Sequence, residues 1–181
     1  MKRIVWTFGL IAGGIMAAMM LVTMVFMDQI GFDKGEVIGY STMVLAFMMV
    51  YFGIRSYRDT VMGGRIGFGR AFRVGILISL VASACYVATW ETMYYTMMPD
   101  FGTKYASHLI ERERKNGASD AQIAAKQKEM QQFQEQYRNP VINVGLTFLE
   151  VFPIGFVVVL VCAGVLSQKG KAGRSPDLAS T

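Results

Sequence analysis

The stretch IVWTFGLIAGGIMAAMMLVTMVFM at residues 4–27 runs for 24 residues without a charged side chain. As a helix rising about 1.5 Å per residue, it is long enough to cross about 30 Å of hydrocarbon with some tilt. The run is too long for a cleaved signal peptide, and no A-x-A-like site follows it, so we interpret it as a retained anchor. Gly9, Gly13 and Ala17 recur every fourth residue, which predicts a close contact with another helix.

Three further apolar windows follow, at residues 37–54, 74–98 and 141–166. The whole chain is 53% hydrophobic, above the roughly 45–50% of a soluble domain, and its charges are crowded between the windows. We therefore predict an all-α integral membrane four-helix bundle that forms a single domain over residues 1–181. A helical insert at 99–140 separates the third and fourth spans, and we expect a disordered polar tail at 167–181.

The basic residues follow the topology of a membrane protein, which explains the net charge of +5 without a nucleic-acid partner. They gather on one side of the predicted membrane, whereas the turn after the first span is acidic. The positive-inside rule then predicts cytoplasmic N- and C-termini. The residues in question are Lys2, Arg3, Arg55, Arg58, Arg65, Arg70, Arg73, Lys169, Lys171 and Arg174.

The insert at 99–140 has the pattern of two amphipathic helices, and the topology places it outside. Asn116 and Gly117 end the first helix, and Ser119 with Gln122 forms a capping box that begins the second. We expect their apolar stripes to pack on each other, on the membrane surface or on a partner protein. The stripes consist of Phe101, Tyr105 and Leu109 in the first helix, and of Ile123, Met130, Phe133 and Tyr137 in the second.

Two carboxylates, Glu91 and Glu150, fall inside the apolar windows at similar depths, on the outer side of the midpoint. A charge in the bilayer centre costs about 2.5–3.5 kcal/mol or more, so something must offset it. Pro153 follows Glu150 within one turn and frees the carbonyl of Leu149. Such a polar spot is typical of a cation site, a proton relay or a ligand pocket, and Glu36 in the acidic turn is a further candidate.

A purely structural interpretation of the same carboxylates stays open. A protonated Glu150 would hydrogen-bond a neighbouring helix and fix the packing. Glu91 lies beside Trp90 and Tyr94 at the outer headgroup level, where it can extend toward water. The polar partners available to Glu150 are Thr89, Thr92, Asn143 and Thr147.

The loop before the third span contains five arginines and no lysine, interleaved with aromatic residues and glycines. Guanidinium groups suit phosphates, so anionic lipid headgroups on the cytoplasmic face are the expected partners, with plain topological charge as the alternative. The loop lacks the motifs of a nucleotide site. The predicted lipid-binding residues are Arg55, Arg58, Arg65, Arg70 and Arg73.

No motif predicts an enzyme. His108, the only histidine, pairs at i, i+3 with Glu111, but further ligands for a metal ion are missing. The chain has no Gly-x-Ser-x-Gly elbow and no HExxH motif. We therefore expect no catalytic residues, no metal and no cofactor.

Five segments resemble a bacterial family of small inner-membrane proteins, known as domain of unknown function 4199. The resemblance covers nearly the whole chain and implies four membrane helices in a bacterial inner membrane, but no reaction, substrate or partner. The segments are GEVIGY at 35–40, FGIRSYRD at 52–59, IGFGRAFRVG at 66–75, MPDF at 98–101 and NPVINVGLTFLEVFPIG at 139–155.

Three hypotheses for function follow from these patterns. The favoured one is a non-enzymatic structural or accessory membrane subunit, either a homo-oligomer or bound to another membrane protein through residues 99–140. The second is a small transporter or ion-coupled carrier that uses Glu150, with Glu91 and Glu36, as its titrating or cation-binding group. The third is a protein that binds anionic lipid through the arginine loop.

Overall fold

The computed structural model describes residues 1–167, which form seven helices and no strand. The predicted tail at 167–181 lies, beyond Ser167, outside the described residues. Four of the helices are long and apolar enough to cross a membrane, which confirms the predicted all-α class with four candidate spans. The helices are α1 Lys2–Val25, α2 Met27–Ile30, α3 Phe32–Thr60, α4 Phe68–Thr96, α5 Phe101–Lys115, α6 Asp120–Tyr137 and α7 Pro140–Leu166.

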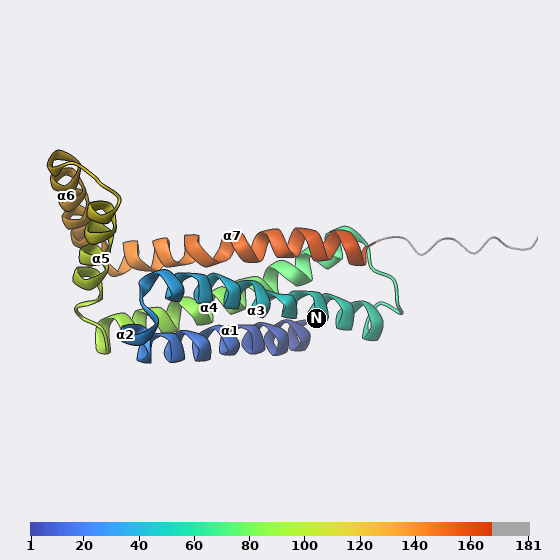
Figure 1. Ribbon diagram of the computed structural model, residues 1–181. Coiled ribbons are helices and arrows are strands. Elements are labelled where there is room, and N and C mark those ends of the chain that lie inside the picture. The colour runs from blue at the N-terminus through green and yellow to red at the C-terminus, as the bar shows by residue number, and fades with distance from the viewer. Residues whose placement is uncertain (168–181) are drawn as a thin grey trace, which may run out of the picture.

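The four long helices, α1, α3, α4 and α7, lie side by side in one bundle and alternate in direction along the chain (Figure 1). The longest of them extend beyond the apolar windows. Helix α3 begins at Phe32 and ends at Thr60, and α4 begins at Phe68, so only a short loop with positive φ at Gly63 and Gly64 joins them. The helices are longer than the apolar windows because hydropathy indicates only the part in contact with hydrocarbon, whereas backbone hydrogen bonds continue into the polar region.

The acidic stretch at 28–36 is helical for most of its length, rather than an open turn. It contains α2 and the first turn of α3, separated by Gly31, whose φ of 78° interrupts the helix. Glu36 therefore lies on α3, one turn before Tyr40. This helical register decides which way the carboxylate faces.

Close backbone approach holds α1 against α4, as the small-residue stripe predicted. A Cβ on Gly9 would lie 2.7 Å from the Cβ of Val81, and one on Gly13 would lie 2.5 Å from the Cβ of Cys85. Larger residues at these positions would push the two helices apart. Cys85 itself carries a free thiol.

The middle of the bundle is a dry core around Phe47, whose side chain is fully buried. Its ring packs against Gly155 of α7, where an added Cβ would lie 2.6 Å from the ring. The outer surface of the same helices carries exposed apolar side chains such as Leu45, Val157 and Val161. This inside-out distribution is what hydrocarbon as a solvent permits.

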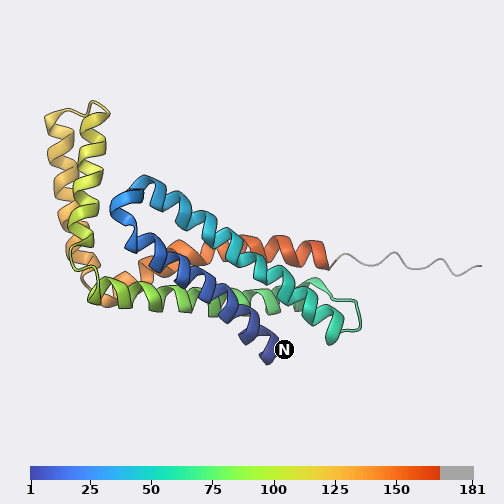
Figure 2. The ribbon, with the colours of Figure 1, turned by 60° about the horizontal axis from the view of Figure 1, so that its bottom comes forward.

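Helices α5 and α6 form the predicted hairpin at one end of the bundle, and they run across its long axis (Figures 1 and 2). The capping box is confirmed: the amide of Gln122 donates to Ser119 Oγ at 3.4 Å, and the Ser119 amide donates to Gln122 Oε1 at 2.8 Å. Gly117 ends the preceding turn with a φ of 83°. The opposite end of the bundle carries the α3–α4 loop.

The joint between α6 and α7 consists of Arg138 and Asn139 alone. Both backbone amides bond back to α6, to the carbonyls of Gln134 and Gln136 at 3.1 and 3.0 Å. The Asn139 side chain then accepts from the amide of Val141 at 3.0 Å and so caps α7. Hydrogen bonds therefore run through this joint from one helix into the next.

Candidate ligand-binding cavity

A cavity of about 440 Å³ lies at the end of the bundle where the hairpin crosses it. All four long helices and both hairpin helices contribute to its wall. The volume falls within the roughly 300–1,000 Å³ typical of small-molecule sites. A space of this size and composition is the strongest candidate for a functional site in the described part of the chain.

Helical spacing aims one stripe of each helix at this space. Residues three or four apart lie on one face of a helix, so a regular sequence pattern becomes a wall. Helix α4 contributes Tyr86, Trp90 and Tyr94, and α3 contributes Glu36, Tyr40 and Met43. The other stripes are Met16, Met20, Thr23 and Met27 near α1, Leu146, Thr147 and Glu150 on α7, Phe101 and Tyr105 on α5, and Met130, Phe133, Gln134 and Tyr137 on α6.

Aromatic rings form a connected layer where the hairpin meets the bundle. The ring of Trp90 lies 5.0 Å from Phe101 in an edge-to-face contact, and Tyr94 lies 5.4 Å from Tyr137. Phe32 at the start of α3 contacts Tyr105 at 5.7 Å. These contacts join helices that are distant in sequence and hold the hairpin against the bundle.

A buried hydrogen-bond network fixes the base of the hairpin. The indole nitrogen of Trp90 donates to Tyr137 Oη at 2.9 Å and to Asn143 Oδ1 at 3.1 Å. Thr147 Oγ1 donates to the same Asn143 oxygen at 3.2 Å and lies 3.4 Å from Tyr137 Oη. Burial raises the pKa of Tyr137, and its hydrogen bonds with Thr147 and Trp90 oppose that rise. The network links α4, α6 and α7.

Two carboxylates, Glu36 of α3 and Glu150 of α7, open into the cavity, and no lysine, arginine or histidine lines it. Within residues 1–167, neither carboxylate makes a side-chain hydrogen bond or an ion pair. Their charges reach the hairpin: burial raises the pKa of Tyr105, and Glu36 and, more weakly, Glu150 raise it further, against Arg112. The site therefore has a negative field without a cation in its wall.

A polar contact at the outer edge joins the hairpin to the start of α3. Asp33 Oδ1 lies 3.1 Å from His108 Nε2 and 3.6 Å from Arg112 Nη1, both on α5. The ring of Phe32 lies 5.1 Å from that of His108. We call Asp33, His108 and Arg112 the hairpin latch, because these side chains join α5 to the start of α3.

Comparison with known proteins identifies a family. The family described as Protein of unknown function (DUF4199) has a model that matches residues 7–168. The chain belongs to the DUF4199 family. Searches of curated proteins and of solved structures returned no match. The DUF4199 match extends over all four long helices and the hairpin.

Among the polar residues predicted in the membrane windows, this DUF4199 chain brings Glu150 and Glu36 to one cavity, whereas Glu91 and Pro153 lie outside its lining. Pro153 is exposed on α7, and α7 continues through it. One oxygen of Glu91 is buried without a hydrogen-bond partner. None of the expected partners hydrogen-bonds Glu150: Thr89 and Thr92 donate to backbone carbonyls, Asn143 Oδ1 and Thr147 belong to the Trp90 network, and Asn143 Nδ2 is buried without a partner among the described residues.

Sequence reasoning missed most of the wall of the DUF4199 cavity. Trp90 and Tyr94 do lie near the outer end of α4, but Trp90 is only 8% exposed and faces inward. A usable signal existed in the spacing of Tyr86, Trp90 and Tyr94, which places three aromatic residues on one face. The methionines gave no comparable signal, because their spacing equally fits a core.

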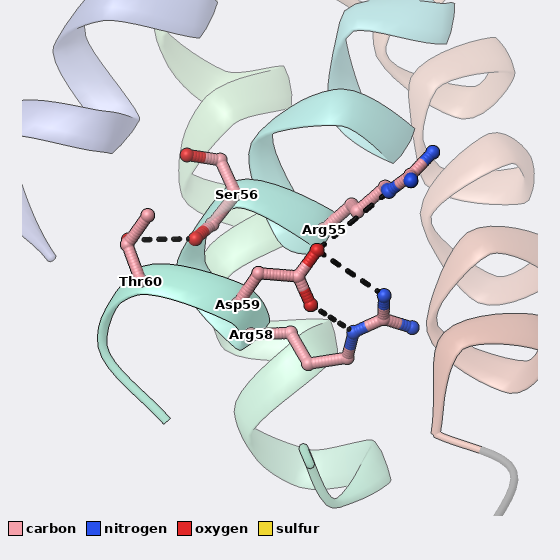
Figure 3. A network of polar contacts seen from close by, with 5 residues as sticks. All are labelled: Arg55, Ser56, Arg58, Asp59 and Thr60. Atoms are coloured by element: carbon pink, nitrogen blue, oxygen red, sulfur yellow. Dashed lines mark hydrogen bonds and ion pairs between the residues drawn. The ribbon is translucent and has the colours of Figure 1, made fainter. Parts of the chain in front are cut away.

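The arginine loop lies at the opposite end of the bundle from the cavity (Figure 1). Asp59 takes up two of its arginines, with Arg58 Nε at 2.7 Å and Arg55 Nε at 3.6 Å (Figure 3). Thr60 next to them donates to the Ser56 carbonyl at 2.7 Å. The three remaining arginines are exposed and have no carboxylate partner within residues 1–167: Arg65, Arg70 and Arg73.

The His108–Glu111 pair does not form a contact of its own. His108 faces Asp33, and Glu111 pairs with Lys115 at 2.8 Å, which lowers the pKa of the Glu111 carboxyl. The part of the DUF4199 chain that the structure describes contains no group of three or more histidine, cysteine, aspartate or glutamate residues placed to hold a metal ion.

Proposed function

We propose that this protein is a non-enzymatic, multi-pass carrier of a bacterial inner membrane. Both of its termini lie in the cytoplasm, and the hairpin lies outside. A small ligand enters the cavity beneath the hairpin, and Glu150 is the titrating or cation-binding group, assisted by Glu36. The observation that carries this proposal is the cavity itself, which holds two carboxylates and no basic residue.

The position of Glu150 supports binding rather than packing. A carboxylate that only fixed the packing of the helices would accept hydrogen bonds from neighbouring donors, because an unpaired polar group in a membrane is costly. Glu150 instead opens into a space large enough for a ligand, and its side chain makes no hydrogen bond within residues 1–167. A ligand, a proton or water has to offset the charge, and a site at which a ligand or a proton does so is the requirement of an ion-coupled carrier.

Flux measured in proteoliposomes tests the proposal. The purified protein is reconstituted and exposed to a broad panel of inorganic ions and organic solutes. We expect uptake of at least one of them, abolished by Glu150→Gln. Glu91→Gln is the matched control, since that glutamate lies on α4 outside the cavity, and it should leave flux unchanged. Melting temperatures and gel filtration of both variants verify that they fold.

The alternative function, an accessory membrane subunit, draws support from the hairpin, which extends beyond the bundle. Residues 99–140 would then bind a second copy of the chain or another membrane protein. Absence of flux for every solute in the panel, from folded protein, would contradict the carrier and favour this alternative.

The exposed arginines at the cytoplasmic end would bind anionic lipid headgroups in either case. Arg65, Arg70 and Arg73 are better placed for phosphates than Arg55 and Arg58, which Asp59 already pairs. Replacing these three arginines with alanine should release anionic lipid that otherwise stays bound through purification. Unchanged lipid content would count against this role.

A further inference from the structure

We infer that the ligand of this cavity is a hydrophobic organic cation. The inference rests on the proposed function, because it names the chemical class of the molecule that the carrier takes. It follows from the charge of the wall, from the groups around the charge and from the size of the space.

The charge of the wall selects a cation. Of the 27 residues that line the cavity, two have acidic side chains, Glu36 and Glu150, and none has a basic one. Tyr105 of the hairpin lines the same space as these two carboxylates. An anion would meet two carboxylates and no basic group, so like-charge repulsion disfavours its binding. A neutral ligand would leave both carboxylates without a counter-charge.

The surroundings of the carboxylates favour an organic cation over a small inorganic one. A hard metal ion needs about six oxygen ligands, but much of this wall consists of thioethers and rings. A diffuse positive charge with apolar substituents suits this environment.

The aromatic and methionine side chains supply that apolar contact. Ring faces attract cations, and the attraction grows as water is excluded. Tyr40 lies on α3, one turn from Glu36, and Tyr86 and Trp90 lie on α4. Seven methionines line the rest, and their flexible thioethers adapt to ligands of different shapes. They are Met16, Met19, Met20, Met24, Met27, Met43 and Met130.

A pair of ions of the same shape tests the inference. Tetraphenylphosphonium and tetraphenylborate both carry four phenyl rings but have opposite charge. Equilibrium binding of each is measured on protein in phosphatidylcholine nanodiscs, with empty nanodiscs subtracted. We expect saturable binding of the phosphonium ion and none of the borate. The double variant Glu36→Gln/Glu150→Gln should weaken binding by about tenfold or more, as expected for loss of partly desolvated charge contacts.

Matched variants separate charge from folding. Glu91→Gln should bind like the wild type, and Glu150→Asp should retain more affinity than Glu150→Gln. Equal binding of both ions, or wild-type affinity in the double variant, would overturn the inference. If the double variant fails to fold, the comparison of the two ions on the wild-type protein still decides.

The two proposals fail separately. Glu150-dependent flux of some other solute, without phosphonium binding, would overturn the ligand class and leave the carrier in place. Phosphonium binding without flux of any solute would keep the cation site and overturn transport.

Discussion

Trp90 connects three helices through one nitrogen atom. Its indole N–H lies within 3.1 Å of acceptors on both Tyr137 and Asn143, and its ring contacts Phe101. Asn143 is fully buried, and its Nδ2 has no partner among the described residues. Its side chain is therefore held by the hydrogen bonds that Oδ1 accepts from Trp90 and Thr147. The residue thus holds the hairpin in place and forms part of the cavity wall at once.

Replacing Trp90 with phenylalanine should destabilise the protein by about 1–3 kcal/mol, because it removes the shared donor and leaves space behind the smaller ring. The measurement is unfolding of the purified protein in mild detergent, followed by circular dichroism. Trp6→Phe is the control, since Trp6 is 57% exposed on α1 and should tolerate the change. Equal melting temperatures for the two variants would refute the structural role given to Trp90.

Helix α1 is the element whose fit to the bundle depends most directly on small residues. Its glycines at positions 9 and 13 lie against Val81 and Cys85 of α4, whereas Gly14 has no atom within 4 Å of the place where a Cβ would be. Adjacent glycines on the same helix thus face different surroundings. One faces a neighbouring helix, and the other faces outward.

Gly13→Ala should lower stability by about 1–3 kcal/mol through overpacking, in spite of alanine's higher helix propensity. Gly14→Ala should be neutral or should stabilise the protein by up to about 1 kcal/mol. Thermal unfolding of both variants in the same detergent measures the difference. A Gly13→Ala protein as stable as Gly14→Ala would mean that α1 does not pack on α4 as closely as described.

The molecule as a whole is a bundle with a cover at one end. The hairpin latch joins the α5–α6 hairpin to α3 through side chains on the surface. The Trp90 network joins the same hairpin to α4 and α7 through buried side chains. Exposed ion pairs stabilise little, about 0–1 kcal/mol, so the latch is the weaker attachment. The edge of the hairpin near Asp33 should open first.

Asp33→Asn should therefore loosen α5 without unfolding the bundle. We expect faster amide hydrogen exchange in residues 101–115 and unchanged exchange in the core of α4, measured by mass spectrometry in nanodiscs. Asp28→Asn is the matched control, because Asp28 lies in the same acidic stretch and makes no ion pair within residues 1–167. Unchanged exchange in α5 would show that the latch does not hold the hairpin.

The sequence was sufficient to predict the four spans, the hairpin and its capping box, because hydrophobic period, helix caps and charge are local signals. It also drew attention to Glu150 and Glu36. It did not predict the cavity, whose wall forms only when Tyr86, Tyr105 and Met43 meet from separate helices. Such contacts depend on helix rotation and on packing distance, which no local pattern in a single sequence encodes.

The hydrogen-bonded joint at Arg138 and Asn139 has a mechanical consequence. A joint of two residues with both amides engaged leaves little freedom between the helices, so we expect a displacement of α6 to be transmitted to the start of α7. Glu150 lies on that helix, and α7 ends at Leu166 near the arginine loop. A movement of the α5–α6 hairpin would thus be coupled, through one rigid helix, to the position of Glu150 and to the opposite end of the bundle.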